Sequence, residues 1–354
     1  MSRFFSEKYS KLVPYTPGEQ PKTRQYIKLN TNESPFPPSA KAIEYAAEAA
    51  KNLQLYPDPE CRRLTETVAD RLGVSYEEVL MTNGSDEILN FAFMAFCDDS
   101  RPAAFADITY GFYSVFAEIN RIPYVKIPLA EDFTIRPEDY YNLGKTIFIA
   151  NPNAPTGIAL SRDQIEEIVR RNPHTVVVVD EAYVDFGAQS CVPLIRKYDN
   201  LLVTQTFSKS RSMAGARLGF GVGCPALIRD LNTIKYSTNP YNINAMTMAA
   251  GIGVMEDEDY TRMGCRTIME NRQYTAEELT KLGFILTPSL TNFVFARHPD
   301  MDGGEIYRAL KERGILVRHF DAEKITDYNR ITIGSKEQMV TLIQTLRTIL
   351  EERI

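Results

Sequence analysis

The sequence of 354 residues predicts an α/β protein with a large domain, built on a mainly parallel sheet, and a smaller α+β domain. Three observations support this prediction. The chain is longer than one minimal core needs, which favours two domains. Short apolar runs alternate with amphipathic stretches from residue 79 to residue 204, and long helical stretches dominate from about residue 241 onwards.

The elements of the large domain follow from periodicity. Apolar residues recur every three or four positions in residues 39–52 and 60–72, which is typical of amphipathic helices, and a proline-rich turn separates the two. Further along the chain we expect strands at 79–82, 103–106, 124–127 and 146–149, and helices at 86–96, 112–120 and 161–171. Strands that alternate with helices are joined by crossovers, which predicts parallel pairing.

The clearest strand is T-V-V-V-V-D at residues 175–180, because four successive valines suit a strand that is covered on both faces. Two more strands are expected at 201–204 and 217–223, and the glycines of the second favour an antiparallel or edge strand. Open α/β sheets bind their ligands at the carboxyl ends of the strands, so we expect these three segments to meet at one site.

The smaller domain is predicted from the remaining elements. We expect helices at 245–256, 257–282, 304–313 and 336–353, and strands at 284–286, 292–296, 316–318 and 330–333. The predicted division is an amino-terminal segment, 1–35, that contributes to the small domain and the active site, a large cofactor-binding domain, 36–245, and a small domain, 246–354.

Composition argues against several classes of protein. The net charge is −6, from 40 basic and 46 acidic residues without long runs, so we expect no nucleic-acid partner. Five scattered cysteines and three histidines argue against a disulfide framework and a metal site. No apolar stretch is long enough to span a bilayer, and the first ten residues lack the apolar core of a signal peptide. These features predict a cytoplasmic protein without a membrane partner.

Three short motifs carry groups that a particular kind of cofactor needs. Asp180 ends the valine strand in D-E-A-Y, Lys209 follows in T-F-S-K, and Arg217 lies eight residues later in A-R-L-G-F. Taken singly, these are more often a helix cap, a solvated lysine and an ordinary ion pair. Together they suit a cofactor with a basic ring nitrogen, an aldehyde and a phosphate, which would bind a carboxylate, an amine and a guanidinium.

The sequence resembles the pyridoxal-phosphate-dependent aminotransferases of fold type I, and among them the family of histidinol-phosphate aminotransferases. Besides the three motifs above, the resemblance rests on V-P-Y-T-P-G at 13–18, L-N-T-N-E-S-P-F at 29–36, N-G-S-D-E at 83–87, N-P-N-A-P-T-G at 151–157 and R-I-T-I-G at 330–334. It therefore covers almost the whole chain. It implies a fold type I transferase that holds pyridoxal phosphate on Lys209 and moves an amino group between an amino donor and a 2-oxo acid.

The resemblance also assigns roles to single residues. It makes Lys209 the residue that binds the cofactor as a Schiff base and moves protons, with Asp180 on the ring nitrogen and Tyr183 on the ring hydroxyl oxygen. The groups it implies for the phosphate are Ser85, Asp86, Thr206, Ser208, Arg217 and, from a second subunit, Tyr56. Since Tyr56 would cross between subunits, the resemblance implies a homodimer with shared active sites.

The remaining residues implied by the resemblance face the ring or the substrate. Tyr110 matches the aromatic residue that stacks on the cofactor, and Arg330 matches the arginine that clamps the acidic end of the substrate. Tyr15 and Asn32 match weaker substrate contacts. One position departs from the family pattern, because Ala154 stands where an asparagine normally bonds the ring hydroxyl. We expect Tyr183 to take over that role, helped by a water or by Asn151 or Asn153.

The favoured reaction converts histidinol phosphate and 2-oxoglutarate to imidazole acetol phosphate and glutamate, as a step of histidine biosynthesis, by ping-pong kinetics. Two alternatives share most of the motifs: an aromatic amino acid aminotransferase, and a lyase similar to threonine-phosphate decarboxylase. A third alternative is a cofactor-binding sensor. We expect a sensor to carry a DNA-binding helix-turn-helix, for which the amino-terminal segment offers no room.

Overall fold

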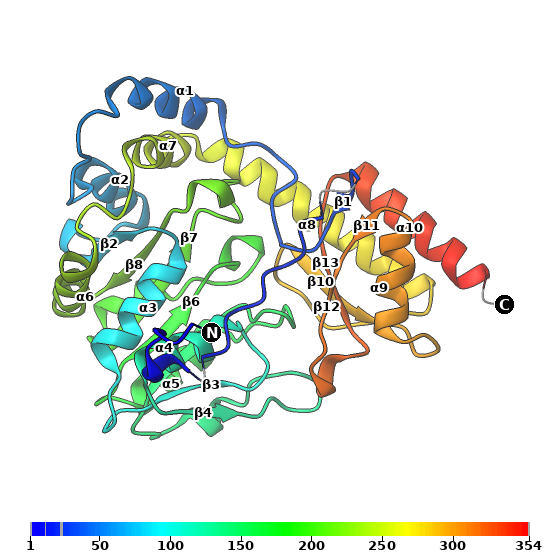
Figure 1. Cartoon of the computed structure of the whole chain (residues 1–354), viewed down its shortest axis with the longest axis horizontal. Coiled ribbons are helices and arrows are strands. Elements are labelled where there is room, and N and C mark those ends of the chain that lie inside the picture. The colour runs from blue at the N-terminus through cyan, green and yellow to red at the C-terminus, as the bar shows by residue number, and fades with distance from the viewer. Residues whose placement is uncertain (1, 11, 22–23, 353–354) are drawn as a thin grey trace.

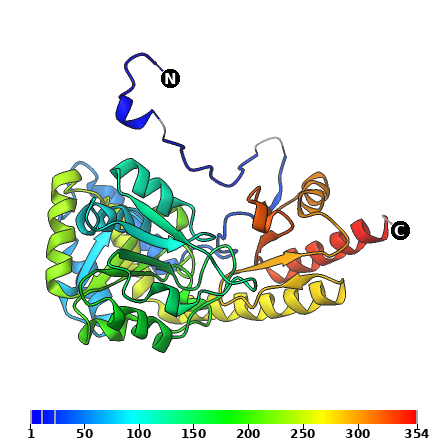
Figure 2. The ribbon, with the colours of Figure 1, turned by 90° about the horizontal axis from the view of Figure 1, so that it is seen from below.

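The computed structural model describes residues 2–10, 12–21 and 24–352. The chain folds into a large unit around a seven-stranded sheet and a small unit around a four-stranded sheet (Figure 1). Helix α8 (Glu258–Lys281) runs from beside the large unit along the small one. Figure 2 shows the amino-terminal segment leaving the small unit and running towards the large one.

The large sheet confirms the predicted fold class. Its strands, in the order β2-β8-β7-β6-β5-β3-β4, are β2 (Val79–Thr82), β8 (Gly219–Gly223), β7 (Leu201–Thr206), β6 (Val177–Asp180), β5 (Thr146–Ala150), β3 (Ala103–Ala106) and β4 (Tyr124–Ile127). Every strand is parallel to the others except β8, which runs antiparallel to both of its neighbours. The expectation that this strand is antiparallel or lies at an edge is confirmed by its antiparallel pairing, while the edge itself is β2.

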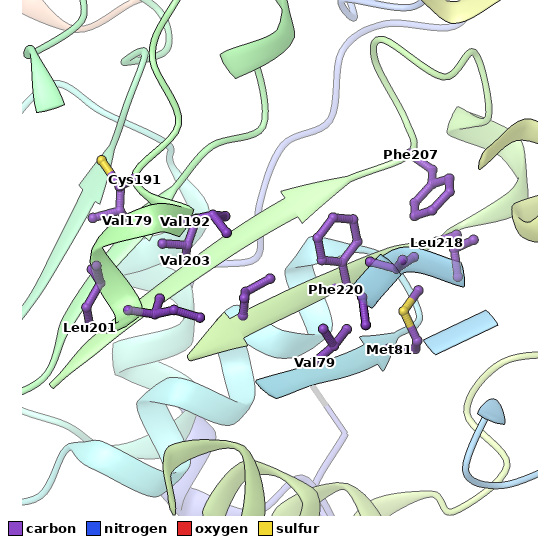
Figure 3. Close-up of a cluster of buried hydrophobic side chains, with 14 of the residues drawn as sticks. Val79, Met81, Val179, Cys191, Val192, Leu201, Val203, Phe207, Leu218 and Phe220 are labelled. Carbon is purple, nitrogen blue, oxygen red and sulfur yellow. The ribbon is translucent and has the colours of Figure 1, made fainter. Parts of the chain in front are cut away.

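The valine strand is covered on both faces, as its composition predicted. Val177 and Val179 point into one core, which helices α2 (Arg62–Leu72), α5 (Arg162–Arg171) and α7 (Ala245–Met255) cover. Figure 3 shows part of this core. Val178 points into the other core, with α3 (Ser85–Phe96), α4 (Phe112–Asn120) and α6 (Pro225–Thr238). Alternate side chains of a strand face opposite sides of the sheet, so a strand that is covered on both sides has no position that faces solvent.

Helix α6 was missed by the sequence analysis. It begins at Pro225, which suits the first position of a helix because proline has no N–H to leave unpaired there. Leu227, Ile228 and Leu231 then lie on its buried side. These two signals, a proline start and apolar residues three or four positions apart, would have been enough to predict the helix.

The small unit has the predicted α+β character. Its sheet, in the order β12-β13-β10-β9, is antiparallel and consists of β12 (Arg318–His319), β13 (Asn329–Thr332), β10 (Phe293–Arg297) and β9 (Ile285–Leu286). Helices α9 (Gly303–Glu312) and α10 (Lys336–Glu351) complete it. The single strand expected at 316–318 is two strands, because β11 (Ile315–Leu316) pairs instead with β1 (Ile27–Lys28) of the amino-terminal segment.

The buried residues of each core indicate which helices belong to the large unit and which to the small unit. Helix α1 (Ala40–Ala49) and helix α7 both contribute buried residues to the core beneath the large sheet. Cys265, Ile268 and Leu279 of α8 and Leu29 of the amino-terminal segment contribute to the core of the small unit. The division into 1–35, 36–245 and 246–354 stays a prediction, and we propose moving its second boundary from residue 246 to the start of α8.

Candidate functional site

Two adjoining cavities lie between the carboxyl ends of the central strands, the small unit and the amino-terminal segment. The inner cavity, about 260 Å³, is lined by Thr31, Glu33, Ser85, Asp86, Tyr110, Ala150, Pro152, Ala154, Asp180, Ala182, Tyr183, Thr206, Ser208, Lys209, Ala214 and Arg217. The outer cavity shares Thr31, Tyr110, Ala154, Tyr183 and Lys209 with it and adds, among others, Tyr15, Asn32, Arg318, Phe320 and Arg330. The structure thus brings together every predicted site residue except Tyr56.

Lys209 lies where the two cavities meet, in the loop that follows β7. Its Nζ donates a hydrogen bond to the backbone oxygen of Thr31 at 3.2 Å and lies 5.8 Å from the centre of the Tyr183 ring. Burial, together with the positive charge of Arg330, lowers the pKa of Lys209 to about 8. A larger fraction of this amine is therefore unprotonated near neutral pH than in a solvated lysine, which makes it a candidate nucleophile and base.

Asp180 ends β6 at the floor of the inner cavity. Its carboxylate accepts hydrogen bonds from the Tyr113 hydroxyl at 3.1 Å and from the backbone N–H of Ala182 at 3.2 Å. Burial raises the pKa of Asp180 to about 6. No lysine, arginine or histidine among residues 2–10, 12–21 and 24–352 forms an ion pair with it. A buried carboxylate that lines a cavity and has no ion-pair partner of its own suits a ligand that carries a positive charge at that point.

An anion-binding cradle lies at the amino-terminal end of α3. No side chain caps this end, and Gly84, with a φ of 82°, lets the chain turn tightly into Ser85 and Asp86. Opposite, Arg217 donates to the Asp86 carboxylate at 3.1 Å and to the Ser208 hydroxyl at 3.4 Å. Helix N–H groups, the helix dipole and a guanidinium are together typical of a phosphate site.

Gly219 of β8 holds this cradle in place. A Cβ atom at this position would lie 2.4 Å from the backbone nitrogen of Ser85 and 2.6 Å from the carbonyl carbon of Gly84. We expect Gly219→Ala to lower the free energy of unfolding by about 1–3 kcal/mol, because backbone rather than a flexible side chain must move. Urea denaturation measures this. Gly264→Ala is the control, since its Cβ would meet only the Phe36 ring at 3.6 Å; equal effects of the two changes would contradict the expectation.

Aromatic rings form one wall of the site. The Tyr110 hydroxyl donates to the Asp86 carboxylate at 2.6 Å, which fixes its ring beside the cradle. Tyr15 of the amino-terminal segment stacks on Phe112 with ring centroids 4.2 Å apart and stands at the mouth of the outer cavity. Both residues are where the sequence analysis placed them. Whether they contact a ring and a substrate stays a prediction.

The edge of the site around Ala154 differs from the expectation. The Asn151 side chain exchanges two hydrogen bonds with the backbone of Leu160, at 2.7 and 3.1 Å. Asn153 bonds Ile108, Thr156 and Thr109 at 2.7–3.1 Å. The prediction that a water, Asn151 or Asn153 helps Tyr183 stays a prediction, but neither asparagine lines either cavity, and Asn153 donates both of its amide hydrogens to Ile108 and Thr156. Tyr183 instead receives a hydrogen bond from the Asn32 amide at 2.8 Å.

Two arginines face each other across the antiparallel pair β12 and β13. Arg318 and Arg330 are direct partners in register, and both line the outer cavity. Arg330 donates to the backbone oxygen of Asn30 at 3.1 Å, and its buried Nε has no hydrogen-bond partner within the described part of the chain. Like charges directly opposite one another in a sheet are unfavourable, so this pair indicates an anion site. Arg318 was missed, although it ends a predicted strand just as Arg330 begins one.

Two more tyrosines differ from the site that the sequence predicts: Tyr56 lies outside the cavities, and Tyr113 contacts Asp180 without having been predicted. Tyr56 is 83% exposed and stacks on Tyr241 with ring centroids 4.7 Å apart, so it does not reach the cavities of its own chain. Its role across a subunit boundary stays a prediction. Tyr113 was missed, and its signal was weak: it lies three residues after Tyr110 in an aromatic stretch that is also typical of core packing.

The described residues contain no group of three or more histidine, cysteine, aspartate or glutamate side chains arranged to hold a metal ion. Within the same ranges, no helix has both the length and the apolar character that crossing a membrane requires.

The chain is similar to known proteins over almost its whole length. The family model for aminotransferase class I and II matches residues 24–346. The histidinol-phosphate aminotransferase of Marinomonas sp. (strain MWYL1) is 50% identical over 353 residues, which cover 99% of this chain and 100% of that relative. The histidinol-phosphate aminotransferase of Aromatoleum aromaticum (strain DSM 19018 / LMG 30748 / EbN1) is 46% identical over 355 residues, which cover 99% and 100% of the two chains.

Solved structures add a likeness of fold. The histidinol-phosphate aminotransferase from Sinorhizobium meliloti, solved in complex with pyridoxal-5'-phosphate, superposes with a TM-score of 0.84 and covers 92% of each chain. The two sequences are 24% identical, so this likeness concerns the architecture.

Proposed function

Since this chain belongs to the aminotransferase class I and II family, we propose that it is a pyridoxal-phosphate-dependent transaminase whose substrates are histidinol phosphate and 2-oxoglutarate. Its products are then imidazole acetol phosphate and glutamate, as in histidine biosynthesis. The observation that carries the choice of substrate is the pair Arg318 and Arg330, which presents two guanidinium groups to the cavity that also contains Lys209. A doubly charged phosphate suits such a pair better than an aromatic ring does.

The residues of the inner cavity fit the cofactor. The cradle of α3 and Arg217 suits a phosphate, the buried Asp180 suits a protonated ring nitrogen, and Lys209 supplies the amine. When bound, pyridoxal phosphate supplies an aldehyde that condenses with amines and a ring that withdraws electrons from the carbon next to the nitrogen. Three groups of the cofactor would thus have chemically complementary partners in one cavity.

Asp180 and Lys209 have different roles in the proposed reaction. With the cofactor bound, the negative charge of Asp180 would favour a protonated ring nitrogen, because the carboxylate is buried and forms no ion pair within the described residues. Lys209 Nζ is the group that would move the proton at the amine-bearing carbon of the donor. Its pKa of about 8 lies near the working pH, where a general base transfers protons most effectively.

Arg330 and Arg318 hold the anionic end of each substrate in turn. Arg330 is half-buried, and its guanidinium lies over the rings of Phe293 and Phe320, 5.3 and 5.7 Å from their centres, so the two rings restrict its position. Arg318 reaches the same cavity from β12 and also bonds backbone oxygens of the amino-terminal segment at 3.3 Å. The phosphate of the donor and a carboxylate of 2-oxoglutarate are both within the chemistry that guanidinium groups recognise.

Replacing Arg318 with glutamine is expected to raise the KM for histidinol phosphate about 10–100-fold, since a hydrogen bond to a charged group contributes about 1.5–3 kcal/mol. The KM for phenylalanine, which carries no phosphate, should rise less than threefold. Steady-state kinetics with both donors measure the difference. Arg297→Gln, on strand β10 of the same sheet and outside both cavities, is the control. An equal rise for both donors would argue against a phosphate subsite.

A donor screen separates the proposed function from its rivals. Purified protein with pyridoxal phosphate should show a visible absorbance band and convert histidinol phosphate only when 2-oxoglutarate is present, with parallel double-reciprocal plots. Faster turnover of phenylalanine would favour an aromatic aminotransferase. Release of carbon dioxide from phosphothreonine without a 2-oxo acid would favour the lyase. Absence of both the band and any turnover would overturn the proposal.

We also propose a cytoplasmic homodimer in which Tyr56 completes the phosphate site of the partner chain. The support is an exposed apolar surface around Tyr56, with Leu53 and Leu55 exposed by 55% and 65% and Tyr241 stacked against it. Exposed apolar patches of this kind are typical of protein interfaces. Sedimentation of the purified protein tests the proposal, and a monomer with full activity would contradict it.

A further inference from the structure

A short chain of hydrogen bonds ends on the Tyr183 hydroxyl. The backbone N–H of Asn32 donates to the Thr332 hydroxyl at 3.0 Å, and this hydroxyl donates to Asn32 Oδ1 at 3.0 Å. Asn32 Nδ2 then donates to the Tyr183 oxygen at 2.8 Å. Thr332 is 2% exposed, and among the described residues its hydroxyl has no acceptor other than Asn32 Oδ1, so the need to pair this buried proton sets the direction of the chain.

The direction of the chain decides where the tyrosine proton lies. The buried Thr332 hydroxyl gives its proton to Asn32 Oδ1, and the amide therefore turns its NH2 group to Tyr183. The Tyr183 oxygen is therefore an acceptor on this side. Within the described ranges no protein group accepts its proton, and the residue lines both cavities. The O–H bond thus points into the site.

The surroundings prevent Asn32 from turning. Its side chain is 1% exposed, its backbone oxygen accepts from Asn292 at 2.9 Å, and its φ of 54° lies in the left-handed region that asparagine tolerates. The Tyr183 ring is held edge-on against Phe293 with centroids 5.2 Å apart. Asn32 therefore links the amino-terminal segment, the small unit and the large unit at one atom of the site.

We infer that Asn32 is a positioning residue, which fixes the Tyr183 hydroxyl as a hydrogen-bond donor to the ring oxygen of the cofactor. This inference rests on the proposed function, and it gives Asn32 a role other than the substrate contact that the resemblance implied. Ala154 lines the same cavities and has no side-chain hydrogen bond to offer. Of the two positions that the resemblance assigns to that oxygen, 154 and 183, only Tyr183 has a donor to offer, so the direction of its hydroxyl matters.

The test uses the pH midpoint of the visible absorbance of the cofactor-loaded protein. This midpoint reports a proton on the nitrogen that joins Lys209 to the cofactor. Loss of a donor to the neighbouring ring oxygen leaves more negative charge there, which holds that proton more tightly and raises the midpoint. We expect Tyr183→Phe to raise it by about one to two pH units, since a hydrogen bond to a charged oxygen contributes about 1.5–3 kcal/mol.

The decisive variant is Asn32→Asp, which has the same shape but cannot donate when ionised. An aspartate would accept the Tyr183 proton, turn the hydroxyl away from the cavity and raise the midpoint about as much as Tyr183→Phe. Asn32→Ala leaves the hydroxyl free to donate, so it should raise the midpoint less than Asn32→Asp. A residue that only supports the fold would show the larger effect with alanine.

A double variant separates hydrogen-bond direction from added charge. Charged groups near Tyr183 are Arg330 of β13, Lys209, Asp180 of β6 and Asp86 of α3, and they remain in every variant. If Asn32 acts through the tyrosine, Asn32→Asp adds little to Tyr183→Phe in the double variant. An additive shift would mean that the new charge acts directly, and the inference would be wrong.

Thr332→Val provides a second route to the same conclusion if Asn32→Asp does not fold. It removes the hydroxyl that fixes the amide, and we expect a rise between those of Asn32→Ala and Tyr183→Phe. An unchanged midpoint in Thr332→Val and in Asn32→Asp, with a shifted midpoint in Tyr183→Phe, would overturn the inference and leave the proposed function standing. Failure of the unaltered protein to take up pyridoxal phosphate would instead overturn the proposed function.

Discussion

Replacing Lys209 with alanine is expected to lower turnover about 10⁴-fold, the upper range for loss of a positioned base, and to abolish covalent retention of the cofactor. Lys209 Nζ lies at the junction of the two cavities, between the cradle for the phosphate and the pair of arginines for the substrate. No other lysine among the described residues lines either cavity. The protein therefore has no amine in place to substitute for it.

Three measurements check this expectation. Borohydride treatment followed by mass spectrometry should place the cofactor on the peptide that contains residue 209 in the unaltered protein and nowhere in Lys209→Ala. Methylamine in the assay should restore part of the turnover, because a small free amine can enter the space left by the side chain. Lys281→Ala, an exposed lysine at the end of α8, should behave as the unaltered protein. Full turnover of Lys209→Ala would refute the proposed mechanism.

The positions of the groups proposed to bind the cofactor could be predicted because each lies at a recognisable strand or helix end. Asp180 ends a strand whose successive valines predict burial on both faces. Lys209 follows the neighbouring strand in the sheet. Parallel strands that lie side by side bring their carboxyl ends to one edge. Local patterns and one topological rule were therefore enough to place these two residues together.

The contacts that escaped prediction join segments far apart in the sequence. Asn32 and Thr332 are 300 positions apart, and their hydrogen bond exists only because the amino-terminal segment adds to the small unit. Arg318 faces Arg330 through the register of two short strands, which the apolar pattern of residues 316–318 does not encode. In the same way, Asn151 and Asn153 look like free amides in the sequence, and only the folded loop shows that backbone groups occupy them.

Replacing Asp180 with asparagine is expected to lower turnover about 10³-fold, in the range for loss of one preorganised charged group. Asparagine has nearly the same shape and can still accept from the Tyr113 hydroxyl, so the fold should persist. What it lacks is the negative charge that keeps the ring nitrogen protonated. Asp199→Asn, in an exposed turn, is the control. Retention of normal turnover by Asp180→Asn would show that the ring needs no charged partner.

The same substitution should stabilise the protein when it is prepared without cofactor. Burial raises the pKa of Asp180 from 3.8 to about 6, so the folded chain binds this proton more tightly than the unfolded chain. The stabilisation is then fully present below about pH 4 and is lost as the pH rises through about 6, a difference of about 3 kcal/mol. Asparagine does not titrate, so urea midpoints measured from pH 4 to pH 7 should fall less in Asp180→Asn.

Glu181 gives the unaltered protein a slope of the same sign, because burial raises its pKa to about 7. The difference between the two proteins at each pH removes this contribution, since Glu181 is present in both. If the difference stays constant from pH 4 to pH 7, Asp180 does not titrate as its burial requires. If the difference grows with pH, the ionised carboxylate of Asp180 lowers the stability of the cofactor-free fold. The same negative charge is the one that the proposed reaction requires. The residue that is best for the reaction is then not the residue that is best for stability at position 180.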